Sequence, residues 1–405
     1  MDDDLVLLRI VVSPEKEIYR DCDLYIYQAN GSDNGKPSLR RLPRPPGRWV
    51  FDYEYTGLLR CSYNDSGDRS ILRSHGINKA EFIIAALCDA SDPDVYAELP
   101  DDKHLDPGSD ECYALYLYNS KDETWSVNLV SLDKQQQQKQ PGGEDCFLHF
   151  NNKVITIGGE AGTMGFVDLY RGIILCDVLK GDPKKLRYAP LPPPMRPDNP
   201  LRGEPHLERD IAVMKGRIKF VEMEVKYDPN LVAWDGRYTN DGWMVWTWSR
   251  PVVSANSVAG ANAVADDWIM ECPILSSDDI EVENNPHFQL LPTPQDNTFR
   301  PLQLPPFRGL AVCHPALSLC DDDDTVCLMN KIFHGDKKAW VMAIDVGGKE
   351  LRGVARFAAD RTELVTFAYA HSRISKYLTG VSGSMVPRWG MTFILFGYFM
   401  YRITL

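Results

Sequence analysis

The chain has 405 residues, and its content of 44% hydrophobic and 25% charged residues excludes a disordered protein and is typical of a globular one. The formal net charge is -13, so the surface repels phosphate backbones and we expect no nucleic-acid partner. Ten cysteines lie scattered without a disulfide framework, and the start of the chain has no basic or apolar leader region, so we expect a cytoplasmic or nuclear location.

Short apolar runs predict strands along most of the chain. They are rich in Val, Ile, Tyr and Trp and are separated by Gly, Asp, Asn and Pro, whereas long amphipathic helical patterns are scarce. The first predicted hairpin joins residues 24–28 to residues 38–42 through a turn rich in Gly, Asn and Asp. Arg40, Arg41 and Arg44 lie at its end and form either a local basic patch or a solvated loop.

A second hairpin joins residues 113–118 to residues 125–132, and from about residue 150 the predicted strands fall into sets of four. The first set comprises residues 153–158, 164–170, 172–178 and 186–191. The glycine-rich segment from Gly158 to Gly165 lies between the first two of these strands. A phosphate-binding loop needs a helix after it, and here a strand follows, so this segment predicts a turn.

The second set comprises residues 209–214, 217–225, 242–249 and 267–274. Glu222 and Glu224 lie two residues apart in it, so they share one face of a strand. Two carboxylates about 5 to 10 Å apart can hydrolyse a glycosidic bond, which makes this pair the sharpest enzyme hypothesis. Phe220 and Val221 break the apolar alternation and predict a bulge that turns both acids to solvent, which is the alternative.

Trp246 and Trp248 also share a face of a predicted strand, with Trp243 on the opposite face. Stacked indoles can hold a sugar or a peptide, and packing between neighbouring sheets is the alternative. Trp246, Trp248, Glu222 and Glu224 are therefore the candidate binding residues.

The third set comprises residues 310–319, 325–333, 339–346 and 350–357. Cys313, His314, Cys320 and Cys327 are spaced too widely for a structural zinc site, so we expect buried thiols. The run from Asp321 to Asp324 lacks the Gly and Glu positions of an EF-hand loop and predicts a solvated turn. We therefore expect neither a metal site nor a cofactor, and no catalytic residue is assigned.

Sets of four strands that recur along a chain are typical of propeller blades, because each blade has two apolar faces that its neighbours cover. We therefore expect an all-β, irregular β-propeller-like array over residues 1–378, with stacked β-sandwich domains as the alternative. Residues 379–405 form an atypical tail. Its apolar run from Met391 to Tyr401 would reach only about 17 Å as a helix, against a hydrocarbon core of about 30 Å. We expect this run to be a closing strand or an aberrant transcript end, with a membrane contact as the alternative.

Several segments of the sequence resemble those of one protein family. They are Phe166 to Val178 (FVDLYRGIILCDV) and residues 124–133, 186–194, 209–213, 216–222, 246–250 and 372–378. Through them, residues 110–378 resemble a plant family known mainly from grasses, domain of unknown function 1618. The resemblance implies a β-rich domain without assigned site residues, similar to the propellers that follow F-boxes and bind proteins. No F-box is recognisable here.

Together these patterns predict a non-enzymatic protein-interaction scaffold with an unknown protein partner. A carbohydrate-active hydrolase that uses the paired glutamates is the first alternative. Membrane association through the C-terminal tail is the second.

Overall fold

A computed structural model gives the fold of the chain. The described residues are 4–11, 22–29, 37–46, 54–61, 81–97, 99, 112–132, 134–140, 147–179, 186–196, 203–232, 238–252, 268–294, 303–319, 324–333, 336, 338–358, 367–372 and 392–397.

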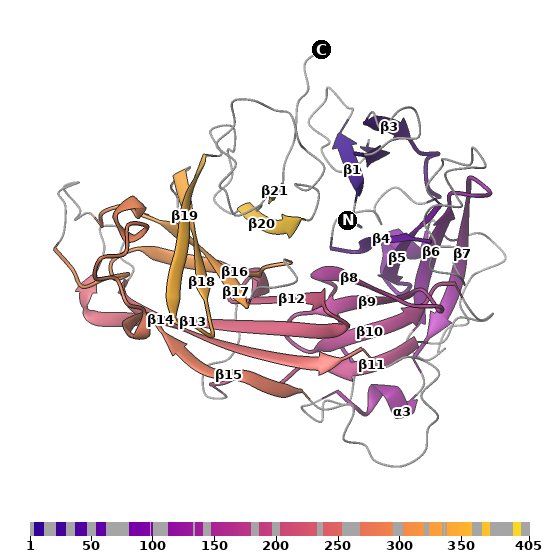
Figure 1. Cartoon of the computed structure of the whole chain (residues 1–405). Helices are drawn as coiled ribbons and strands as arrows, with labels where there is room; N and C mark the ends of the chain where they lie inside the picture. Colours follow the sequence, from indigo (N-terminus) through magenta and orange to yellow (C-terminus); the bar gives the residue numbers. More distant parts are fainter. Residues whose placement is uncertain are drawn as a thin grey trace.

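Two antiparallel sheets come first along the chain (Figure 1). The first sheet contains β1 (Leu5–Val11), β2 (Cys22–Gln28) and β3 (Ser38–Arg41). The second contains β4 (Thr56–Arg60), β5 (Phe82–Asp89), β6 (Cys112–Asn119) and β7 (Thr124–Ser131). The strand order in both sheets follows the chain, because each strand pairs with the next one in the sequence.

Three further four-stranded antiparallel sheets follow, and each again pairs its strands in sequence order. The first contains β8 (Lys153–Gly158), β9 (Thr163–Asp168), β10 (Gly172–Asp177) and β11 (Leu186–Pro190). The next contains β12 (Arg209–Met214), β13 (Arg217–Val232), β14 (Tyr238–Pro251) and β15 (Ile269–Ser276). The last contains β16 (Ala311–Leu317), β17 (Thr325–Lys331), β18 (Lys338–Asp345) and β19 (Glu350–Ala358). A two-stranded pair completes the array with β20 (Phe367–Ser372) and β21 (Thr392–Gly397).

Helices are short throughout the described residues. They are α2 (Pro93–Tyr96), α3 (Lys134–Gln137), η2 (Pro205–Leu207), η4 (Ser277–Asp279) and η5 (Phe288–Leu290). No helix in this part of the chain has the length and apolar character needed to span a bilayer.

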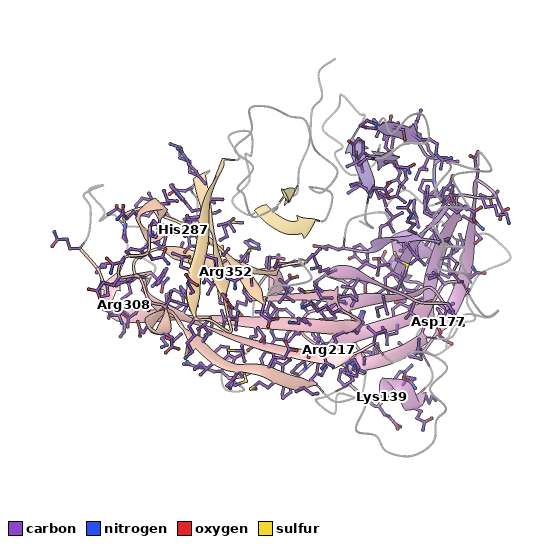
Figure 2. The ribbon with its side chains drawn as sticks, in the orientation of Figure 1. Lys139, Asp177, Arg217, His287, Arg308 and Arg352 are labelled. Carbon is purple, nitrogen blue, oxygen red and sulfur yellow. The ribbon has the colours of Figure 1, made fainter. Side chains whose placement is uncertain are left out.

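The sheets pack face to face as the blades of a β-propeller. The first strand of each sheet contacts the first strand of the next, in the order β1, β4, β8, β12, β16 and β20. Figure 1 shows the sheets following one another in an arc, and Figure 2 shows side chains filling the spaces between them. Strand β5 illustrates why, because its alternate residues face two different sheets. Ile84 and Ala86 pack towards β1–β3, whereas Ala85 and Leu87 pack towards β8–β11. Each sheet therefore needs two neighbours, which confirms the predicted propeller over stacked sandwiches.

The predicted strand sets are found, and most of their ends differ little from the prediction. The exceptions are β13, which continues to Val232 and not to residue 225, and β14, which begins at Tyr238 and not at residue 242. One local prediction is wrong. The pairing of β13 with β14 runs without interruption from Arg217 to Val225, and the bulges lie beyond Val225. Phe220 and Val221 are both fully buried because the neighbouring sheets cover both faces of β13. The two consecutive apolar residues therefore indicate a strand that is buried on both faces, and they do not indicate a bulge.

Candidate functional site

Glu222 and Glu224 lie on the same face of β13 as predicted, but that face is covered and not solvated. Glu222 is 6% exposed, and its carboxylate accepts hydrogen bonds from Arg209 Nη2 at 2.8 Å and from the Met195 backbone N–H at 3.1 Å. Glu224 pairs with Arg196 at 2.8 Å, and burial raises the pKa of its carboxyl. Both acids thus fix the segment after β11 to β13.

Trp246 and Trp248 lie directly across the hairpin from Glu222 and Phe220. Each of the two is only 4% exposed, and both belong to the core between the β8–β11 and β12–β15 sheets. Trp243 points to the other side, where it is fully buried against Phe307 at a ring distance of 5.9 Å. The structure brings the four candidate residues onto one face, and the indoles there pack between sheets.

The cysteines and histidine of the third set lie in or beside the core of β16 and β17. Cys313, His314 and Cys327 are all buried, and burial raises the pKa of Cys313 to about 11, so its thiol stays protonated. A search of the described residues finds no group of three or more His, Cys, Asp or Glu side chains arranged to hold a metal ion. Asp324 forms an ion pair with Lys219 at 2.5 Å, whereas Cys320 and Asp321 to Asp323 lie outside the described residues.

His314 makes stability depend on pH. Burial, with help from the nearby charges of His206 and Lys331, lowers the pKa of His314 to about 3. The unfolded chain takes up this proton near pH 6.5, so stability is full above that pH and falls as the pH drops towards about 3. Between about pH 7 and pH 4, we expect the free energy of unfolding to fall by about 3 kcal/mol less in His314→Asn than in the unmodified chain, as measured by urea unfolding. Asn suits this position because the backbone φ is 52°. An unchanged acid profile would contradict the assignment.

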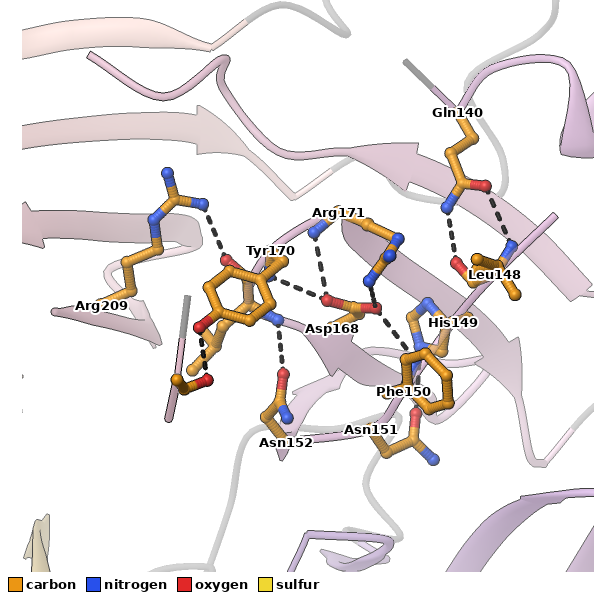
Figure 3. A network of polar contacts seen from close by, with 12 residues as sticks. Gln140, Leu148, His149, Phe150, Asn151, Asn152, Asp168, Tyr170, Arg171 and Arg209 are labelled. Atoms are coloured by element: carbon orange, nitrogen blue, oxygen red, sulfur yellow. Dashed lines mark hydrogen bonds and ion pairs between the residues drawn. The ribbon is translucent and has the colours of Figure 1, made fainter. Parts of the chain in front are cut away.

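Asp168 organises a polar network where β9 ends and β10 begins (Figure 3). Its side chain is 1% exposed. Its two oxygens accept hydrogen bonds from the backbone N–H groups of Phe150 at 2.9 Å and Tyr170 at 2.8 Å. They also accept from the backbone N–H and the guanidinium of Arg171 at 3.2 and 3.3 Å. One carboxylate therefore fixes both the β9–β10 turn and the segment that precedes β8.

The segment before β8 is held at further points (Figure 3). The Gln140 amide both donates to the Leu148 carbonyl at 2.6 Å and accepts from the Leu148 N–H at 3.1 Å. Asn152 accepts from the Leu169 N–H at 2.9 Å, and a ring nitrogen of His149 lies 3.0 Å from Asn151 Oδ1. These bonds leave the backbone on both sides of Phe150 little freedom to move.

Phe150 is the most exposed large apolar residue among the described residues, at 62% of its surface. The Arg171 guanidinium lies over its ring at 5.7 Å, and the side chain of Arg171 is 29% exposed. The neighbouring Tyr170 hydroxyl donates to the Gly203 carbonyl at 2.6 Å. We call Phe150, Tyr170 and Arg171 the Phe150 surface, which presents an aromatic ring, a phenol and a cation on a rigid support.

The sequence patterns did not single out the Phe150 surface. Asp168 to Arg171 carries a usable signal, because Asp at the first position of a tight turn often accepts from the N–H groups that follow. Phe150 carries none, because its backbone N–H is bonded to Asp168, which lies 18 residues away in the sequence.

Comparisons with known proteins complete the description of the site. A search of curated proteins gives no match to this chain. Among solved structures, the WD40 domain of SCAP from fission yeast is similar at 10% identity and a TM-score of 0.30, covering 89% of this chain and 67% of that one. Residues 166–327, which include Asp168, Tyr170 and Arg171, match the model of a family described as a protein of unknown function, DUF1618, and this match supports the resemblance seen in the sequence.

Proposed function

We propose that this protein is a non-enzymatic scaffold that binds another protein through the Phe150 surface. The observation that carries the proposal is the exposure of the Phe150 ring on a backbone that Asp168 holds in place. Exposing this ring contributes nothing to folding, whereas covering it in a complex would contribute about 2 kcal/mol from apolar burial. A ring that is fixed before the partner arrives also loses little conformational entropy on binding.

The composition of the Phe150 surface also suits a protein interface. Aromatic residues and Arg are enriched among the residues that dominate binding energy. The Arg171 guanidinium already lies over the ring, so a partner can pack on the ring edge while Arg171 meets an acidic group. We therefore expect a partner that offers an apolar side chain next to a carboxylate.

The predicted site residues favour neither hydrolysis nor sugar binding. Glu222 is held by Arg209 and Glu224 by Arg196, so each carboxylate already has a cationic partner. Trp246 and Trp248 are buried between sheets, where no sugar ring can stack on them. In the tail, Thr392–Gly397 forms β21 and pairs with β20, which favours a strand over a membrane contact for that segment.

We further propose a plant protein that acts in the cytoplasm or nucleus, with a partner-binding role like that of propellers that follow F-boxes. The sequence resemblance and the composition support these points. The proposal includes no cofactor and no nucleic-acid partner.

The test compares protein partners captured by the full-length chain and by Phe150→Ser. We expect a stoichiometric partner whose affinity falls about tenfold or more in Phe150→Ser, because the ring supplies apolar burial and its contact with Arg171. Leu179→Ser is the matched control. Leu179 is 42% exposed and bonds to Ala161 beside the β8–β9 turn, which lies at the end of this sheet away from Asp168. Equal capture by all three proteins would refute the proposal.

A further inference from the structure

A hollow of about 400 Å³ opens where the first two sheets meet. It is lined by Arg40, Arg41, Leu42, Pro43, Arg44, Tyr118 and Glu123. The arginines come from the end of β3 and the residues after it, whereas Tyr118 and Glu123 come from β6 and from the turn between β6 and β7. We call this hollow the arginine pocket. It shares no residue with the Phe150 surface, so the inference drawn from it goes beyond the proposed function.

The backbone that carries the arginines is fixed at two points. The Leu42 N–H donates to the Leu24 carbonyl at 2.8 Å, and the side chain of Leu42 is buried. The Trp125 indole N–H donates to the Pro43 carbonyl at 3.0 Å. The three guanidinium groups therefore extend from a segment whose position is set before any ligand binds, which lowers the entropy lost on binding.

Two carboxylates orient the arginines without neutralising them. Asp23 is buried, and one of its oxygens lies 2.7 Å from Arg41 Nη2 and 3.5 Å from Arg44 Nε. Glu123 pairs with Arg40 at 2.9 Å. Three positive charges thus face two negative ones. Arg41 and Arg44 remain 53% and 61% exposed, so most of their N–H donors point to solvent.

Tyr118 supplies a further donor to the arginine pocket. Its side chain is fully buried, with ring centroids 6.0 Å from Phe82 and 5.1 Å from Trp125. Its buried hydroxyl lies beside the Arg40 guanidinium, and its O–H has no acceptor among the described residues. A buried O–H without an acceptor is costly, and a ligand oxygen that accepts from it would remove that cost.

We propose that the arginine pocket binds a phosphate monoester. A phosphate dianion offers three oxygens, which match the forked donors of Arg41 and Arg44, the guanidinium of Arg40 and the phenol of Tyr118. A carboxylate offers only two oxygens and would leave part of this donor set without an acceptor. The phosphate belongs either to a small molecule or to a phosphorylated side chain of a peptide.

The test is isothermal titration of the full-length chain with inorganic phosphate, a phosphoserine peptide and the same peptide without phosphate. We expect inorganic phosphate and the phosphoserine peptide to bind. We expect Arg44→Gln to weaken their binding about tenfold or more through loss of charged hydrogen bonds. Tyr118→Phe keeps the ring and is expected to weaken binding several-fold. Arg187→Gln is the control, because Arg187 is 34% exposed and paired with Asp177 outside the pocket.

The outcomes separate the two sources of phosphate. Similar affinities for inorganic phosphate and the phosphopeptide indicate a small-molecule ligand, whereas tighter binding of the phosphopeptide indicates a modified side chain. Thermal melting shows that each variant is folded before it is titrated. Absence of binding in the millimolar range overturns the proposal, and so does binding that Arg44→Gln and Tyr118→Phe leave unchanged.

Discussion

Replacement of Arg209 by Met is expected to lower the free energy of unfolding by about 3–5 kcal/mol. The Arg209 side chain is 0% exposed, and its guanidinium donates to Glu222 at 2.8 Å and to the Leu169 carbonyl at 2.9 Å. The substitution leaves Glu222, which is 6% exposed, without its ion-pair partner. An unpaired buried carboxylate either pays the cost of desolvation or takes up a proton.

Urea unfolding of Arg209→Met, Glu222→Gln and the double variant measures this pair. We expect the double variant to be less destabilised than the sum of the two single variants, because it leaves no buried charge alone. Arg187→Gln removes an ion pair whose side chains are 34% and 22% exposed, and it is expected to cost at most about 1 kcal/mol. If Arg209→Met costs no more than Arg187→Gln, the Arg209–Glu222 pair is not buried as described.

Trp243→Ala is the second substitution with a large expected effect, a loss of about 3–5 kcal/mol in unfolding free energy. Trp243 is fully buried in the core between the β12–β15 and β16–β19 sheets, where it meets Phe307. Removal of the indole leaves a cavity between two blades that cannot close without moving a sheet. Since domains are stable by about 5–15 kcal/mol, this loss is a large share of the total.

Trp243→Phe separates the cavity effect from the polar contribution. The buried indole N–H of Trp243 has no hydrogen-bond partner among the described residues, so Phe removes an unsatisfied donor while keeping most of the apolar volume. We therefore expect Trp243→Phe to cost much less than Trp243→Ala in denaturant unfolding. Equal losses for both variants would show that packing at this position is not what the core requires.

Much of the fold could be predicted from the sequence because each hairpin has a local pattern of apolar runs and turn residues. The twelve strands from β8 to β19 were all predicted, since each apolar run ends at a turn signal, but β13 continues to Val232 and not to residue 225. Strand β5 (Phe82–Asp89) was missed because residues 82–88 form a continuous apolar run, which periodicity alone does not assign to a strand. The bulge predicted at Phe220 and Val221 is absent because neighbouring sheets bury both faces of β13 there.

The sites were harder to predict because they combine residues from distant parts of the chain. Arg40, Arg41 and Arg44 were noted as either a local basic patch or a solvated loop, but their pocket also needs Tyr118 and Glu123, which belong to another sheet. Glu222 was correctly placed on one face with Glu224, yet nothing in the local pattern indicates that Arg209 meets it across the sheet. Contacts between distant parts of the chain, and not local spacing, decide whether such charged groups hold the fold together or are free to bind a ligand.

Binding of a protein by the Phe150 surface can be measured directly by crosslinking. The most direct measurement places a photo-crosslinking amino acid at position 150 and, as the matched control, at Tyr96, which is 39% exposed on α2. We predict one adduct of defined mass from position 150, which an excess of the unlabelled chain suppresses, and no such adduct from position 96. Identical crosslinking from both positions, or none from position 150, would contradict the claim.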